Sequence, residues 1–162
     1  MSAKGITLIA TVLSIPAVLL AADDPFVGTW KLNLAKCKYN PGPPPKSQTY
    51  KFEPSGANGV KFTAEGVDAR GNRIHREYTA NYDGKDNPVT GNPDADSVSL
   101  KRVDAYTVEG AQKLAGKLVR TFRRAVSKDG KTVTVTEKGM NSHGQAYNNL
   151  VVYDRQSEPR LP

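Results

Sequence analysis

The sequence predicts an all-β protein, an antiparallel up-and-down β-barrel of about eight to ten strands. Apolar and polar residues alternate with a period of two, as in residues 60–65 and 133–136. This pattern is typical of strands with one face on a core and the other in water. Clusters of Gly, Asn and Asp, such as residues 68–72 and 128–131, separate these runs and indicate tight reversals. No segment after residue 22 shows the apolar stripe of a helix.

The expected strands follow one another along the chain with short connections. They cover residues 26–33, 47–54, 60–66, 73–82, 86–90, 97–103, 106–112, 117–126, 132–139 and 146–154. Because these connections are too short for crossovers, neighbours in the sequence should pair antiparallel. Closure into a barrel removes exposed edges, and a β-sandwich is the structural alternative. The long connection contains a proline-rich run, residues 41–45, for which we expect a stiff loop that can lie across one barrel mouth.

The first 22 residues have the pattern of a cleavable secretory signal peptide. Lys4 precedes an apolar run, and small residues stand just before Asp23. The run is short for a membrane span and Pro16 interrupts it, so a retained anchor is the weaker alternative. We expect cleavage after Ala21 or Ala22 and an exported protein, either periplasmic or secreted. Residues 23–162 would then form one barrel domain without membrane contact.

The charge pattern and the single cysteine limit the possible functions. The formal net charge is +7, but Lys and Arg are dispersed among acids in runs no longer than two, so we expect no nucleic-acid partner. Cys37 is the only cysteine, which rules out an intrachain disulfide. Lys36 and Lys38 beside it favour a lowered thiol pKa. With no histidine nearby in the sequence, we expect no catalytic role for Cys37.

Catalytic and metal-binding motifs are absent from the sequence. There is no Gly-x-Ser-x-Gly, and acids such as Asp94 and Asp96 lie in an expected turn. Two histidines and one cysteine do not form a zinc-binding spacing. We therefore expect no catalytic residues, no metal and no cofactor. An enzyme, or a barrel that binds haem through His143 or His75, is a weaker alternative.

The start of the first expected strand carries a resemblance to a known superfamily. Gly28, Thr29 and Trp30 form a Gly-x-Trp triplet, which resembles the first signature of the lipocalin and fatty-acid-binding superfamily. The resemblance implies that the glycine permits close backbone approach and that the indole plugs the closed end of the barrel. It also implies that a late Arg packs across the indole, for which Arg123 and Arg124 are the candidates.

A second resemblance covers most of the chain. Residues 28–33, 41–44, 82–86, 88–93 and 127–132 are similar to segments of small exported bacterial proteins described as lipocalin-like, whose function is largely uncharacterised. The resemblance implies a barrel and no established activity, since a fold does not determine a function. The cysteine pair and the C-terminal helix of well-studied lipocalins are not apparent here, which favours a minimal barrel.

If the apolar face of each strand points inward, the strand register predicts the lining of the lumen. That lining contains Tyr50, Phe52, Val60, Phe62, Ile74, Tyr78, Tyr82, Val98, Leu100, Leu118, Phe122, Val133 and Val135. The same parity includes the charged residues Arg76, Arg102, Arg120, Arg124 and Glu137. A register slip of one residue would instead place these arginines in solvent.

Arginines on an apolar inner face predict a ligand. Arg is seldom buried without a partner, so an anionic head group with an apolar body would suit this lumen. Arg76 and Tyr78 also resemble the Arg-x-Tyr pair of fatty-acid-binding proteins, although on a different strand. The expected ligand-binding residues are Arg76, Tyr78, Arg102, Arg120, Phe122, Arg124, Tyr50 and Phe62. We predict an exported binding protein for a small hydrophobic or amphiphilic ligand. A ligand-free structural or interaction barrel is the alternative, and the oligomeric state is left open.

Overall fold

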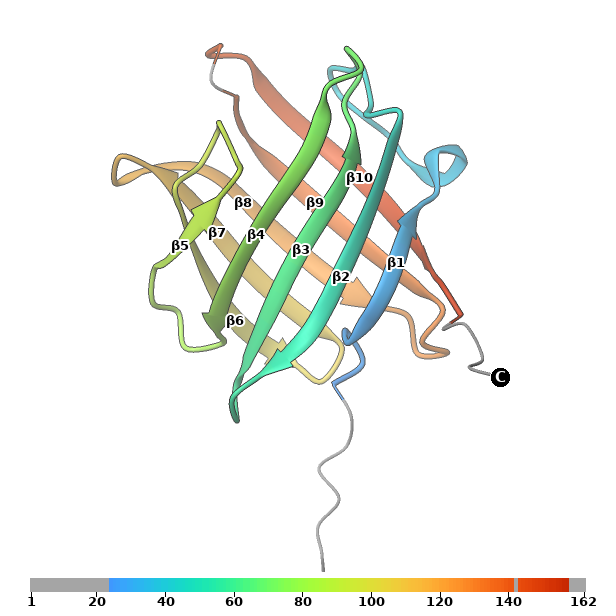
Figure 1. Cartoon of the computed structure of the whole chain (residues 1–162), viewed down its shortest axis with the longest axis vertical. Helices are drawn as coiled ribbons and strands as arrows, with labels where there is room; N and C mark the ends of the chain where they lie inside the picture. The colour runs from blue at the N-terminus through green and yellow to red at the C-terminus, as the bar shows by residue number, and fades with distance from the viewer. Residues whose placement is uncertain (1–23, 142, 158–162) are drawn as a thin grey trace, which may run out of the picture.

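The computed structural model describes residues 24–141 and 143–157, and these form a closed antiparallel barrel of ten strands (Figure 1). In chain order the strands are β1 (Gly28–Leu32), β2 (Ser47–Ser55), β3 (Gly59–Val67), β4 (Arg73–Asn81), β5 (Asn87–Thr90), β6 (Ser97–Asp104), β7 (Thr107–Leu114), β8 (Lys117–Val126), β9 (Thr132–Met140) and β10 (Ala146–Arg155). Each strand pairs with its sequence neighbours, and β1 pairs with β10 to close the barrel. The predicted fold class is confirmed, and each strand lies within two residues of its expected bounds.

Some of the sequence lies outside the described residues. The predicted signal peptide falls there, as do position 142 and residues 158–162. One short 3-10 helix, η1 (Leu34–Lys36), follows β1 in the described part of the chain. No described helix has the length and apolar character needed to cross a membrane.

Residues 24–27 enter at one end of the barrel (Figure 1), and this end is closed by side chains. Phe26 and Trp30 are fully buried there, and the Trp30 indole Nε1 donates a hydrogen bond to the Phe26 carbonyl at 2.8 Å. Arg102 forms an ion pair with Asp24 at 2.5 Å and lies 4.0 Å from the centre of the Tyr82 ring. Arg102, which the sequence placed among the ligand-binding residues, therefore belongs to the closure of this end.

The stacking partner of Trp30 is Arg155, which corrects the expectation of Arg123 or Arg124. The Arg155 guanidinium lies 3.9 Å from the centre of the indole ring, and the two residues pair across β1 and β10. At Gly28, φ is +130° and a Cβ would lie 2.6 Å from the Arg155 guanidinium. Only glycine leaves room for this contact without strain.

The same guanidinium also ties the entering chain to the barrel. Its N–H groups donate hydrogen bonds of 2.6 to 2.8 Å to the backbone carbonyls of Pro25, Val27 and Gly130. Hydrogen bonds from a charged donor are stronger than those between neutral groups. Arg155 therefore joins the N-terminal segment, the β8–β9 turn and the last strand at the closed end.

The alternation of apolar side chains produces the expected lumen, with one exception. Most of the predicted lining is buried, namely Tyr50, Phe52, Val60, Phe62, Ile74, Tyr78, Val98, Leu100, Phe122, Val133 and Val135. Tyr82 is half-buried at the closed end, whereas Leu118 is 61% exposed. The pairing of β7 with β8 shifts register between Gln112 and Lys113. Because such an irregularity breaks the period of two, it turns Leu118 outward.

Candidate functional site

A cavity of about 590 Å³ opens at the end of the barrel opposite Trp30. Its rim is formed by the proline-rich residues 41–45 together with the β3–β4, β5–β6 and β9–β10 connections. Its inner wall is formed mainly by tyrosine and polar side chains, with two aliphatic ones among them: Gln48, Tyr50, Ile74, Arg76, Arg120, Glu137, Tyr147, Asn149, Val151 and Tyr153. The volume falls in the range of small-molecule sites, about 300–1,000 Å³.

The proline-rich segment is held at this mouth by β10. Lys38 forms a β-bridge with Leu150, and the Asn148 N–H donates to the Asn40 carbonyl at 2.7 Å. The Asn40 N–H donates in turn to Asn149 Oδ1 at 3.0 Å. The prolines that follow have a fixed φ and no N–H donor, so the segment forms a stiff part of the cavity rim, as the sequence predicts.

Arg124 lies below this cavity among aromatic rings. Arg124 is 3% exposed, and its Nη1 donates a hydrogen bond to Tyr78 Oη at 2.7 Å. The guanidinium carbon lies 4.3 Å from the centre of the Phe122 ring and 4.9 Å from that of Phe62. Nε has no hydrogen-bond partner within the described structure, and no ion pair between described side chains includes Arg124. A buried guanidinium without a carboxylate is unfavourable.

Arg120 carries the second guanidinium of this region, with its side chain 13% exposed, and it has a carboxylate partner. Nη2 binds Glu137 and Nη1 donates to Gln112 Oε1 at 3.2 Å, while Asn149 Nδ2 donates to the other Glu137 oxygen at 3.0 Å. Burial is the largest single influence and lowers the pKa of Arg120. Glu137 and, to a smaller extent, the neighbouring tyrosines together outweigh it and hold the pKa of the guanidinium above its ordinary value. The Arg120 Nε, like that of Arg124, lacks a partner within the described structure.

Arg76 completes a positively charged floor. It is half-buried on β4 and lines both the mouth cavity and a small recess of about 20 Å³ that reaches Arg120 and Arg124. Three arginines thus line the recess, whereas the carboxylates lie outside it: Glu137 in the Arg120 pair, and Asp68 and Asp94 at the rim of the mouth cavity. An excess of guanidinium over carboxylate at the end of a cavity favours binding of an anion.

Tyr39, Tyr147 and Tyr153 are neutral hydrogen-bonding groups of the wall. Burial raises the pKa of Tyr147 to about 12, and burial also raises the pKa of Tyr39 and of Tyr153. Tyr153 donates its hydroxyl hydrogen to Gln48 Oε1 at 2.6 Å. Its ring stacks on that of Tyr50, with the ring centres 4.1 Å apart. The wall therefore offers flat apolar faces with polar edges.

The structure brings most of the predicted ligand-binding residues together. Six of them line the recess or the cavity, Arg76, Tyr78, Arg120, Arg124, Tyr50 and Phe62, and Phe122 packs against Arg124. The sequence interpretation missed Gln48, Gln112, Tyr147, Asn149 and Tyr153. All five lie at inward-facing positions of their strands, so the period-two alternation could have identified them. Three of them are amides, which interrupt the apolar pattern on which the prediction relied.

The histidines lie away from the charged floor. His75 is exposed on the outer wall, where its Nδ1 lies 3.3 Å from Glu65 Oε1. His143 is exposed at the rim of the cavity. Within residues 24–141 and 143–157, no group of three or more His, Cys, Asp or Glu side chains is arranged to hold a metal ion.

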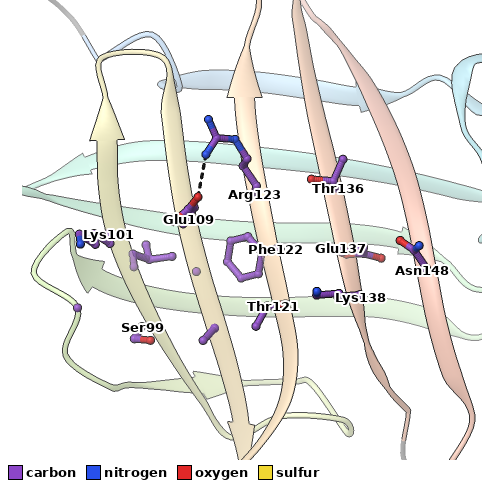
Figure 2. A pocket seen from close by; sticks show the side chains of 14 residues that line it. Ser99, Lys101, Glu109, Thr121, Phe122, Arg123, Thr136, Glu137, Lys138 and Asn148 are labelled. Atoms are coloured by element: carbon purple, nitrogen blue, oxygen red, sulfur yellow. Dashed lines mark hydrogen bonds and ion pairs between the residues drawn. The ribbon is translucent and has the colours of Figure 1, made fainter.

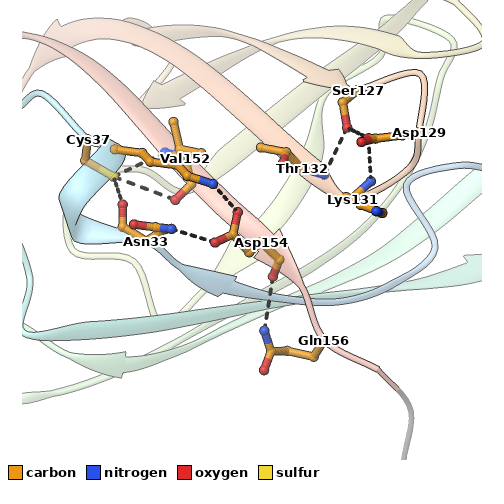
Figure 3. A network of polar contacts seen from close by, with 10 residues as sticks. Asn33, Cys37, Ser127, Asp129, Lys131, Thr132, Val152, Asp154 and Gln156 are labelled. Atoms are coloured by element: carbon orange, nitrogen blue, oxygen red, sulfur yellow. Dashed lines mark hydrogen bonds and ion pairs between the residues drawn. The ribbon is translucent and has the colours of Figure 1, made fainter.

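Cys37 is held in a network of polar contacts beside β10 (Figure 3). Its Sγ donates to the Asn33 carbonyl at 3.1 Å and accepts from the Val152 N–H at 3.2 Å. Burial raises the pKa of the Cys37 thiol, which corrects the lowered pKa that the neighbouring lysines suggested. The thiol is therefore a packed, weakly reactive group.

A second hollow, of about 640 Å³, lies on the outer wall over β6–β10 (Figure 2). Arg123 and Glu109 form an ion pair at 2.7 Å within it, with side chains 49% and 52% exposed. Lys101 and Lys138 are also exposed there. Because these charges are solvated, they gain little from a bound counter-charge, and the cavity at the mouth is the better candidate site.

No protein-family model and no curated protein matches this sequence. Among solved structures, the chain is similar to the wild-type fluorescent protein UnaG, with 15% identity, a TM-score of 0.51 and coverage of 81% of this chain and 97% of UnaG. It is also similar to Rv2717c from M. tuberculosis, with 14% identity, a TM-score of 0.51 and coverage of 82% and 94%. At such low identity the likeness confirms the β-barrel fold alone. Membership of the small exported bacterial group stays a prediction.

Proposed function

We propose that the protein is an exported carrier that binds a small amphiphilic molecule, anionic head inward, in the mouth of the barrel. The observation that supports it most is the buried guanidinium of Arg124, whose Nε lacks a partner below a cavity of about 590 Å³. A carboxylate, sulfonate or phosphate oxygen would supply the missing acceptor and offset a buried charge.

The charges of the floor determine the orientation of the bound molecule. Glu137 and Asn149 already occupy one side of Arg120, so the ligand head is attracted to the recess between Arg76 and Arg124. The body of the ligand then extends past the stacked rings of Tyr50 and Tyr153 toward the proline-rich rim. Small-molecule sites usually combine aromatic or apolar surface with convergent polar groups that fix the orientation of the ligand.

Calorimetric titration of the purified mature protein tests this proposal. Undecanoate, 2-naphthoate and phenyl phosphate serve as anionic ligands, and we expect at least one to bind in a ratio of one to one. Arg76→Ala should weaken that binding about tenfold or more, because a hydrogen bond to a charged group contributes about 1.5–3 kcal/mol. The matched control is Arg123→Ala, on the outer wall of β8, which should leave the affinity unchanged. Failure of all three anions to bind would overturn the proposal and favour a ligand-free barrel.

Export is supported by the N-terminal sequence. A lone Lys4, an uncharged apolar run and small residues before Asp23 form the order that secretory signal peptides share. Expression of the full chain in a bacterium should yield mature protein in the periplasm or medium, with Ala22 or Asp23 at its N-terminus by mass spectrometry. Leu13→Arg, which places a charge in the apolar run, should retain the uncleaved chain in the cytoplasm. Uncleaved cytoplasmic wild-type protein would contradict export.

A further inference from the structure

The lumen is filled below the arginine floor. Arg124 lies 5.4 Å from the centre of the Phe52 ring, and Phe52 contacts Phe26 with ring centres 6.0 Å apart. Val60 and Val108 are buried beside them. Packed side chains therefore run from Arg124 to the closed end, and a ligand is confined to the half of the barrel nearest the mouth.

The wall of that half is aromatic and polar at once. Tyr50 and Tyr153 present stacked rings, and Tyr39, Tyr147 and the prolines of residues 41–45 face the same cavity. The side-chain amides of Gln48 and Asn149 line it together with the tyrosine hydroxyl groups, and Ile74 and Val151 add only small aliphatic surfaces. A long alkyl tail laid along this wall would remove water from those polar groups without replacing its hydrogen bonds.

A flat aromatic ring meets this wall more favourably. It can stack on or abut the tyrosine and proline rings, whereas its edge leaves the hydroxyl and amide groups accessible. A rigid ligand also loses less conformational freedom on binding than a flexible chain does. The filled lower half adds a limit on length, since an aromatic carboxylate is more compact than an alkyl acid with the same number of carbons.

We infer that the ligand class is the planar aromatic carboxylates, with the carboxylate at Arg76 and Arg124 and the ring between the tyrosines and the proline-rich rim. The inference rests on the proposed anion site. It adds the chemical class of the apolar part of the ligand that the cavity wall selects. Long-chain fatty acids are then poor ligands, because they need a deep apolar lumen and this one ends at Arg124.

Two acids with the same carbon number and charge, 2-naphthoate and undecanoate, test the inference by calorimetric titration. We expect 2-naphthoate to bind about tenfold more tightly or better, from the added ring contacts. Tyr147→Leu should reduce that preference by weakening 2-naphthoate and sparing undecanoate. The control Tyr106→Leu, outside the cavity, should leave the preference intact, and thermal unfolding checks that both variants fold.

The outcomes separate the two proposals. Equal or tighter binding of undecanoate by the wild-type protein overturns the aromatic class but leaves the anion site standing. Absence of binding by both acids and by phenyl phosphate overturns the anion site together with the inference. Because the comparison of the two acids uses the wild-type protein, its result does not depend on whether Tyr147→Leu folds.

Discussion

Replacing Arg124 with methionine should stabilise the ligand-free barrel while weakening anion binding. The guanidinium gains a 2.7 Å hydrogen bond to Tyr78 and close contacts with the rings of Phe122 and Phe62, together worth about 2–4 kcal/mol. Burying the charged guanidinium costs several kcal/mol in desolvation, and leaving its Nε without an acceptor costs about 1–3 kcal/mol more. These costs oppose the favourable contacts. Methionine is apolar, flexible and able to pack on the same rings. The net gain should be about 1–2 kcal/mol, which raises Tm by about 3–6 °C for a domain of this size.

Thermal and urea unfolding without ligand measure the stability change, and calorimetry with 2-naphthoate measures the binding. Arg155→Met is the matched control, because Arg155 donates to three backbone carbonyls and covers Trp30. That variant should lose about 3 kcal/mol. If Arg124→Met destabilises the barrel as much as Arg155→Met does, Arg124 is a structural group and the argument from its burial to a ligand is wrong.

Three further changes test other contacts. Gly110→Ala places a Cβ 2.2 Å from the Phe122 ring, so it should push the ring into the lumen. The free energy of unfolding in urea should fall by about 1–3 kcal/mol, and 2-naphthoate should bind more weakly. Unchanged binding of 2-naphthoate would contradict this displacement of the ring. Because burial raises the pKa of Cys37, iodoacetamide at neutral pH should modify the folded protein more slowly than the urea-unfolded chain, and equal rates would contradict the burial. A hydrogen bond from Asn33 (Figure 3) and, to a smaller extent, one from Lys36 hold the pKa of Asp154 below its ordinary value. Their stabilisation is present above pH of about 4 and is lost as the pH falls through the lower folded pKa. Asp154→Asn should therefore reduce the fall of Tm below pH of about 4, and an identical acid profile would refute the coupling.

Local sequence patterns predicted the strands and most of the lumen, because alternation and hairpin turns act between near neighbours. Val133 and Val135 point inward as their spacing requires. Leu118 could not be placed, because the irregularity opposite it belongs to the pairing of two strands. Arg155 was missed for a related reason. Its position over Trp30 depends on the first strand meeting the last, a long-range contact that no local period encodes.

The same meeting of first and last strands constrains how the chain folds. Since Trp30 pairs with Arg155, β1 has a free edge until β10 exists, and so does β9. The two strands are separated by almost the whole domain, so bringing them together costs loop-closure entropy before their contacts form. This long-range pairing makes folding slow. A chain that ends before β10 forms an open sheet in which β1 and β9 have unpaired edges that can bind other strands. During synthesis the barrel therefore acquires its cooperative stability in one late step, when the final strand arrives.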